Sequence, residues 1–314
     1  MMRSIATALG MVAAGAAVGC TAAHDDGERF REALPVASDL ALSAPASGSA
    51  RSRGSLAVAP HDAPPPAKFY QFTRNVTDGV DLVTGSVLGS LWLIVHTAPA
   101  SVQVHEATWG PGAGDALSPA VYRLRVTEVE DGVFDYELDG RPKGSGDDGY
   151  LAVLKGRGYG LSHPEHKDGW FLVDNEAART LDPTRSHDTG TVRITHGLRS
   201  WPITIAVELR PAPGPDWLDV NVTHAPDGSG QLDLGGLVDV DDPKNGTPED
   251  VVIGSRWTST GAGRADVAIS GGNAPSLVKA TECWSSSFAR SYYADNGGIA
   301  PPEGDAASCA FPAP

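Results

Sequence analysis

The sequence of 314 residues lacks the short motifs that mark the large classes of enzyme. It contains no G-x-S-x-G elbow, which positions a nucleophilic serine in many hydrolases. It also contains no G-x-x-x-x-G-K-[ST] phosphate loop and no strand–G-x-G-x-x-G–helix unit for a dinucleotide. The glycine-rich stretches 156–160 and 261–264 lie among strand and turn patterns, where glycine usually marks a bulge or bend. We therefore predict no catalytic residues, no cofactor and no enzymatic activity, with a hydrolase as the least favoured function.

Two clusters of possible metal ligands lack the spacing that a metal site needs. His163 and His166 are three residues apart with a proline between them, whereas the zinc-protease pattern has its two histidines four apart on a helix. In the acidic stretch from Asp239 to Asp250, a calcium loop starting at Asp241 would need an oxygen donor and a glutamate at the positions of Pro243 and Val252. We interpret both clusters as solvated loops and predict no metal ligands.

Basic residues and long apolar runs are also scarce. The chain has 24 Lys and Arg against 39 Asp and Glu, a net charge of −15, which disfavours nucleic acid as a partner. The apolar segment within residues 1–19 is shorter than the roughly 20 residues that cross a bilayer. The uncharged stretch 82–95 is short too, and we interpret it as part of a core helix.

The first 19 residues have the pattern of an export signal. Arg3 is followed by a run of small and apolar residues that ends in Ala17-Val18-Gly19-Cys20. A small residue before a cysteine at this place resembles the lipobox of bacterial lipoproteins, although Ala17 stands where that family more often has Leu. In the family, the cysteine receives diacylglycerol and becomes the first mature residue. The alternative is an ordinary secretory signal with a coincidental cysteine.

The lipobox resemblance implies a protein of the cell envelope that is attached to a membrane through a lipid on Cys20. In Gram-negative lipoproteins an Asp after the cysteine commonly marks retention in the inner membrane. Here Thr21 follows, so the outer membrane is favoured if the host is Gram-negative. Residues 20–67 are rich in Ala, Ser, Pro and Gly and predict a flexible tether. Phe30 and Leu34 interrupt it and suggest a short helix or strand that docks on the domain.

Only two cysteines remain if Cys20 carries a lipid. An even pair in an oxidising compartment predicts a disulfide between Cys283 and Cys309. Closing that loop stabilises the fold by roughly 3–4 kcal/mol in the chain-entropy account. Buried free thiols and metal ligands are the alternatives. A zinc site is disfavoured because the sequence has no C-x-x-C pair and no histidine after His224.

Residues 68–96 give the clearest helical pattern, because their apolar residues recur at steps of three and four. From about residue 102 onward the period changes to two. Phe134, Tyr136 and Leu138, for example, alternate with acidic residues, which marks strands with one buried and one wet face. Turn residues between the strands keep connections short, and short connections favour antiparallel neighbours.

These patterns predict a mainly β fold. We expect a curled antiparallel meander of about nine or ten strands, forming a half-barrel or a barrel. One long N-terminal helix at 68–96 is expected to pack on its concave face. The predicted organisation is a signal peptide at 1–19, a lipidated cysteine and tether at 20–67, and a single β-rich domain at 68–314.

Several segments of this domain resemble a group of predicted bacterial lipoproteins, and the likeness covers most of residues 68–311. The group brings no activity with it. At the level of fold alone, a lipidated tether followed by a curled sheet with a helix is similar to envelope lipoprotein carriers and to lipocalins. The segments that carry the family resemblance are Ala107-Thr108-Trp109-Gly110-Pro111, Ser255-Arg256-Trp257, Gly261-Ala262-Gly263-Arg264-Ala265-Asp266 and Glu282-Cys283-Trp284.

Two functions follow from this organisation. A curved sheet around an apolar interior could bind a lipid or another apolar small molecule. The alternative is a structural or interaction lipoprotein of the envelope that has no ligand. The first is slightly favoured, and an empty apolar cavity or a packed core would discriminate the two.

Overall fold

The computed structural model describes residues 27–37, 40, 66–113, 117–184, 189–240, 246–274 and 276–314. The predicted signal peptide, Cys20, Thr21 and most of the predicted tether lie outside these residues. The described residues group into two compact units, and the predicted domain boundaries stay a prediction. Unit 1 contains the described residues within Met1–Ala41, Val80–Ser200 and Ile205–Gly214, and unit 2 those within Leu42–Gly79, Trp201–Thr204 and Pro215–Pro314.

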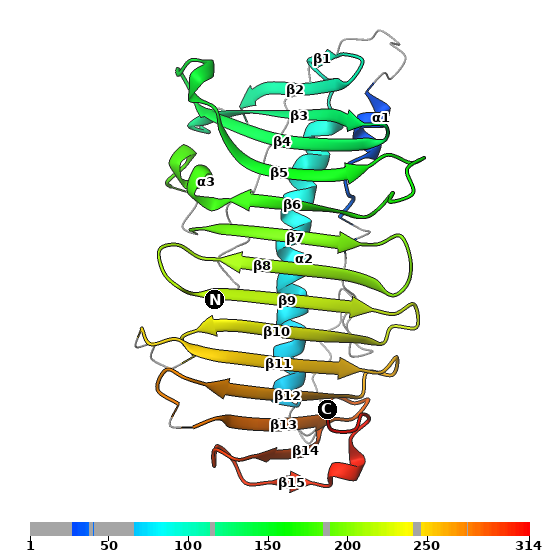
Figure 1. Cartoon of the computed structure of the whole chain (residues 1–314), viewed down its shortest axis with the longest axis vertical. Coiled ribbons are helices and arrows are strands. Elements are labelled where there is room, and N and C mark those ends of the chain that lie inside the picture. The colour runs from blue at the N-terminus through cyan, green and yellow to red at the C-terminus, as the bar shows by residue number, and fades with distance from the viewer. Residues whose placement is uncertain are drawn as a thin grey trace, which may run out of the picture. The chain divides into compact units, whose positions relative to one another are not determined.

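Among the described residues, fifteen antiparallel strands follow one another in chain order in one open sheet (Figure 1). The prediction of a mainly β antiparallel meander is confirmed. The predicted number of nine or ten strands was too low, and the barrel alternative is wrong because the sheet is open, with β1 and β15 as its outermost strands.

Two features hid strands from the sequence pattern. The strands β1 (Ser101–Val102) and β15 (Glu303–Gly304) have two residues each, too few to show an alternation. Glycines interrupt the apolar series in others, as Gly156 does in β5 (Leu151–Tyr159). A Cβ on Gly156 would lie 2.3 Å from the Tyr136 ring, so the ring fills the place of the missing side chain.

Unit 1 contains β1 to β7 and the part of β8 from Ile205 onward. The buried face of its sheet includes the fully buried Trp109, Leu124 and Phe171. The strands after β1 are β2 (Glu106–Ala113), β3 (Ala120–Glu130), β4 (Val133–Pro142), β5, β6 (Gly169–Asp174), β7 (Thr191–Gly197) and β8 (Ile203–Arg210).

Unit 2 consists mainly of three hairpins, β9–β10, β11–β12 and β13–β14. They have the same five-residue turn, at 225–229, 258–262 and 285–289. In each turn the first residue and the fifth are joined by a backbone hydrogen bond, and the fourth has a positive φ. The fourth residue is glycine in two turns and Phe288, with φ 64°, in the third. The strands are β9 (Trp217–His224), β10 (Gly230–Val238), β11 (Glu249–Trp257), β12 (Gly263–Ser270), β13 (Val278–Trp284), β14 (Arg290–Asp295) and β15.

The long helix α2 (Lys68–Val95) lies almost where it was predicted. It precedes the strands but is not at the N-terminus of the chain, which corrects the prediction of an N-terminal helix. In unit 2 its first turn carries Tyr70, whose ring stacks on Phe288 with centroids 4.3 Å apart and lies 5.9 Å from Trp284. One turn further on, the hydroxyl of Thr73 lies 2.7 Å from that of Ser255 on β11.

In unit 1 a short helix, α1 (Glu28–Glu32), falls within the predicted tether. Phe30 is fully buried and meets the Phe134 ring edge to face, with centroids 5.7 Å apart. Arg31 donates a hydrogen bond of 2.6 Å to the carbonyl of Val95, the last residue of α2. The apolar stretch is therefore docked as a helix. The remaining short helices are α3 (Asn175–Leu181), η2 (Asp147–Gly149) and η3 (Ala306–Ser308).

Candidate functional site

The outer face of unit 2 is a grid of side chains from β10 to β13. Outward-pointing residues alternate along each strand, and the register aligns them across strands into rows. The first row is Gln231, Arg256, Arg264 and Cys283; the second is Asp233, Gly254, Asp266 and Thr281; the third is Gly235, Val252, Ala268 and Lys279.

Small residues in the middle of this grid create a groove of about 460 Å³. Gly254 has no side chain, and a Cβ placed there would contact Asp233 Oδ1 at 3.7 Å as its only neighbour within 4 Å. Ala268 and Val252 lie beside it on the floor, and the Val252 side chain is 60% exposed. The groove therefore exists because the central positions are small while the positions around them carry long polar side chains.

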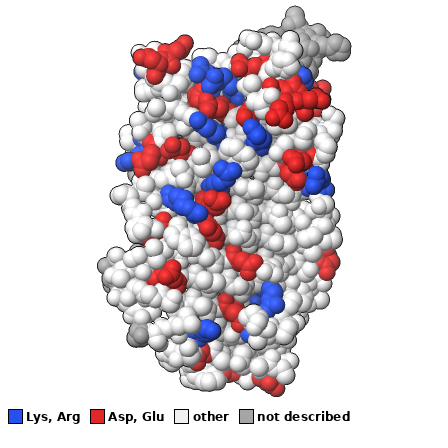
Figure 2. All heavy atoms as spheres, viewed as in Figure 1, with Lys and Arg blue, Asp and Glu red and all other residues white. Residues whose placement is uncertain are grey.

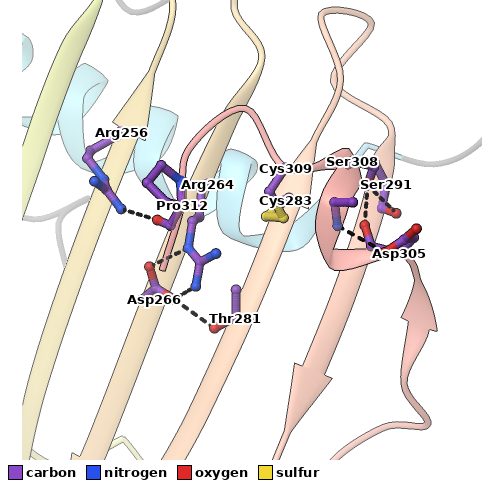
Figure 3. The surroundings of a disulfide bond; sticks show 11 residues. Arg256, Arg264, Asp266, Thr281, Cys283, Ser291, Asp305, Ser308, Cys309 and Pro312 are labelled. Atoms are coloured by element: carbon purple, nitrogen blue, oxygen red, sulfur yellow. Dashed lines mark hydrogen bonds and ion pairs between the residues drawn. A yellow bond between two sulfur atoms is a disulfide. The ribbon is translucent and has the colours of Figure 1, made fainter. Parts of the chain in front are cut away.

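A segment that we call the C-terminal strap, residues 305–314, crosses the same face (Figure 3). Cys309 is joined to Cys283 with a sulfur–sulfur distance of 2.09 Å, so the predicted disulfide is formed. Arg256 donates a hydrogen bond of 3.1 Å to the carbonyl of Pro312, and its guanidinium lies 5.2 Å from the Phe311 ring. Pro314 lines the groove. The disulfide thus fixes one wall of the groove.

The carboxylates of the groove differ in how they are held. Asp266 accepts hydrogen bonds of 2.8 and 2.7 Å from Arg264 and one of 2.7 Å from the Thr281 hydroxyl. Burial alone would raise the pKa of Asp266, but these bonds and the charges of Arg264 and Arg256 hold it below its usual value. Asp233 accepts a 2.6 Å hydrogen bond from the Gln231 amide. Asp266 is therefore a structural charge, whereas Asp233 faces the groove.

The cations that line the groove, Arg256 and Lys279, form no ion pair with a carboxylate among the described residues. Arg264 is paired with Asp266, but the hydrogen-bond partner of Arg256 is a neutral carbonyl. Lys279 is exposed, and among the described residues its side chain has no hydrogen-bond or ion-pair partner. Two cations and two carboxylates line the groove, and the adjoining Arg264 is the cation that pairs with Asp266, so Lys279 keeps a charge that no described carboxylate contacts.

The polar face of unit 1 is different, because its long side chains pair with one another (Figure 2). The ion pairs include Arg125–Glu137 at 2.7 Å and Lys155–Glu137 at 3.3 Å on β3, β4 and β5. Burial and the neighbouring Glu137 raise the pKa of Asp139 in this ladder. Arg123 donates to Asp139 at 3.2 Å and covers the Tyr150 ring at 3.8 Å.

The histidine cluster of the sequence lies in the loop after β5. His163 stacks on Tyr159 with ring centroids 4.8 Å apart, and His166 Nδ1 is 3.0 Å from the Tyr159 carbonyl. Both histidines thus pack against the end of the strand. Within the described residues, no group of three or more His, Cys, Asp or Glu has the geometry of a metal site. Asp241 and Pro243 lie outside those residues, and Val252 lies on the groove floor.

His196 on β7 is only 3% exposed, and no sequence pattern marked it as a candidate site residue. Its Nδ1 lies 3.0 Å from the Lys167 carbonyl, so Nδ1 carries the proton of the neutral ring. Its Nε2 is buried without a partner among the described residues. Burial lowers the pKa of His196, although the Lys167 carbonyl and Asp168 oppose this. The ring borders a second hollow of about 220 Å³ that is also lined by Leu34.

Compared with protein-family models, curated proteins and solved structures, the chain has no match. The resemblance to predicted lipoproteins, carried by segments such as Ser255-Arg256-Trp257, therefore stays a prediction. By length and composition alone, α2 would be able to cross a membrane, but a core helix of a soluble protein has the same properties. The groove of unit 2 is accordingly defined by its own geometry.

Proposed function

We propose that this protein is a lipid-anchored binding protein of the bacterial cell envelope, without enzymatic activity, and that the unit 2 groove is its ligand site. The observation that carries the proposal is the groove, with its floor of small residues and its disulfide-fixed wall. Its volume is within the range of roughly 300–1,000 Å³ that is usual for ligand sites. A disulfide also fits an oxidising compartment outside the cytoplasm.

The anchor in this proposal is a lipid on Cys20, in the outer membrane if the host is Gram-negative. Cys20→Ala is expected to release the protein in soluble form and to abolish its labelling with radioactive palmitate. Label that persists in this variant would contradict the anchor, whatever the groove binds.

The apolar ligand that the sequence suggested would have to lie between α2 and the sheet. We infer that the sheet is curled and that α2 packs on its concave side. In unit 2, buried side chains of both elements, including Tyr70, Trp284 and Phe288, pack together there. This packing favours a ligand on the outer face of unit 2 over one in its interior.

A second candidate function is interaction with another macromolecule through α2. In unit 1, the solvent-facing side of the helix exposes Leu82, Trp92 and Leu93 to 50%, 49% and 40%. Gly85 and Gly89 lie between them, and a Cβ on either would meet no atom within 4 Å. Exposed apolar groups in such numbers often mark an interaction surface.

Native mass spectrometry of residues 21–314, purified from a bacterial periplasm, tests the proposal. We expect an added mass that leaves on denaturation in the wild type and is absent from Gly254→Val. Valine at 254 fills the groove and suits a strand, so the fold is retained. A clean apo mass in both proteins, or the same added mass in both, would contradict the groove as ligand site and favour the surface of α2.

A further inference from the structure

We infer that the unit 2 groove binds an acidic, hydroxyl-rich chain, that is, a segment of an acidic oligosaccharide. This inference rests on the proposed function, because it names the ligand class of the same site. It follows from three features of the groove: acceptors and donors for hydroxyl groups, cations without carboxylate partners, and a floor without deep side-chain pockets.

The second row of the grid provides groups that recognise hydroxyls. Asp233 and Thr281 stand at its two ends, with Gly254 and Asp266 between them. Adjacent strands are about 4.8 Å apart, so the row from β10 to β13 extends about 14 Å and is long enough for more than one sugar ring. An ionised carboxylate only accepts hydrogen bonds, and neighbouring hydroxyls of a sugar supply several donors to it at once.

The cations select a ligand that carries negative charge. Lys279 on β13 has no partner among the described residues, and Arg256 on β11 donates to a carbonyl of the strap. Since Asp266 is already satisfied by Arg264 and Thr281, it does not neutralise Lys279 by a direct contact. A carboxylate on the ligand would give Lys279 the charge-assisted partner that the protein does not provide.

The floor fits flat rings better than peptide side chains. Val252 and Ala268 are a cross-strand pair in the row next to Gly254, and their methyl groups suit the apolar C–H face of a sugar. A peptide strand offers one backbone N–H donor per residue, and it would need pockets for alternate side chains to gain specificity. The floor residues Gly254, Ala268 and Val252 are small and offer no such series of side-chain pockets, so an extended peptide would gain little specificity from them.

Titration calorimetry with the full-length protein, kept with its anchor in detergent, tests the inference. The probes are oligosaccharides of galacturonate, of guluronate and of glucuronate, each paired with its methyl ester, which keeps the hydroxyls and removes the charge. We expect at least one acidic probe to bind and its ester to bind at least about tenfold more weakly, since one lost charge-assisted bond contributes at this scale. Gly254→Val should abolish the binding.

Two lysine variants separate the groove from general charge effects. Lys279→Gln should weaken binding of the acidic probe about tenfold. Lys155→Gln removes the same charge from the outer face of unit 1, where it pairs with Glu137, and should leave binding unchanged. Equal effects of both variants, equal binding of acid and ester, or no binding of any acidic probe would overturn the inference. A groove ligand of another class, found by native mass spectrometry and lost in Gly254→Val, would overturn this inference while the proposed function stands.

Discussion

A comparison of the polar faces of the two units shows that the size of the outward-pointing residues decides whether a groove forms. Both faces are built from the same alternation of buried and exposed residues along antiparallel strands. In unit 1 the exposed positions of β3 to β5 carry long charged side chains that pair with each other. In unit 2 the central positions are Gly254, Ala268 and Val252, and a groove remains.

The two faces differ in whether their charged side chains already have partners within the protein. Exposed ion pairs contribute only about 0–1 kcal/mol each, so the ladder of unit 1 adds little stability. Instead, these ion pairs occupy the hydrogen-bond donors and acceptors of the charged side chains on β3, β4 and β5. In unit 2, Lys279 and the Oδ1 atom of Asp233 have no hydrogen-bond or ion-pair partner among the described residues, and Arg256 donates to the strap. The groove lies where the outward-pointing side chains are small, as at Gly254 and Ala268, and where Lys279 has no ion-pair partner among the described residues.

Removing the disulfide should have the largest effect on unit 2. We expect the double variant Cys283→Ser, Cys309→Ser to lose roughly 3–4 kcal/mol of unfolding free energy, because the loop between the two residues is no longer closed in the unfolded chain. Urea unfolding followed by tryptophan fluorescence measures the loss. A reducing agent should destabilise the wild type and leave the double variant unchanged; equal sensitivity of both would contradict the structural role of the bond.

Two glycine-to-valine substitutions should have opposite outcomes in the two units. Gly156→Val in unit 1 places a Cβ 2.3 Å from the Tyr136 ring and should cost about 1–3 kcal/mol or more through overpacking. Gly254→Val in unit 2 should change the unfolding free energy by less than about 1 kcal/mol. Thermal unfolding of both variants measures the contrast. Similar losses at both positions would mean that Gly254 is not an open position.

The stacking of α2 on the third hairpin of unit 2 should have a smaller effect. Phe288 keeps a positive φ where the two other turns have glycine, and its ring stacks on Tyr70. A double-mutant cycle of Tyr70→Ala and Phe288→Ala should give a coupling of about 0.5–1.5 kcal/mol. Replacing Phe311 on the strap in the same cycle provides the control. No coupling between Tyr70 and Phe288 would contradict the stacking contact.

The smallest expected effects are on the pH dependence of the unfolding free energy, and they differ between the two units. The pKa of His196 in unit 1 is lowered in the folded state, so the unfolded chain binds the proton more readily. Its contribution to stability is present above the unfolded pKa of about 6.5 and is lost as the pH falls through the lower folded value. His196→Gln should therefore flatten the stability profile as the pH falls below the unfolded value of about 6.5. The same profile in both proteins would contradict a neutral, buried His196.

In unit 2, the loss of stability in acid is expected at a lower pH than the loss that His196 causes in unit 1. The pKa of Asp266 is held below its usual value of 3.8, so its contribution is present above that value and is lost as the pH falls below it. Asp266→Asn should remove this lower transition without changing the one near neutral pH. Urea midpoints measured across the pH range for both variants separate the two effects.

The sequence predicted those elements whose signal is local. The helix at Lys68–Val95 was found because its apolar residues recur every three to four positions, and the disulfide because two cysteines remained after Cys20. Strands were missed where a cross-strand ring replaces a side chain, as the Tyr136 ring does at Gly156. One sequence cannot show such a replacement, because the ring comes from a neighbouring strand.

The groove was missed for a related reason. Gly254, Ala268 and Lys279 are separated along the chain and become neighbours only through the register of β11, β12 and β13. That register depends on the five-residue turns and their positive-φ residues, and the third turn uses Phe288 where glycine would be expected. Small residues at outward positions of successive strands were the available signal, and they could be aligned only once the turns were known.

Hydrogen–deuterium exchange of the ligand-loaded and the ligand-free protein tests the central claim most directly. The ligand is the molecule that co-purifies with the wild type, and the ligand-free form is Gly254→Val. We predict that slower exchange in the loaded protein is confined to β10 to β13 and the strap, with the rest of the described chain unchanged. Protection over residues 82–93 of α2 instead, with none over β10 to β13, would contradict the groove as the site of binding.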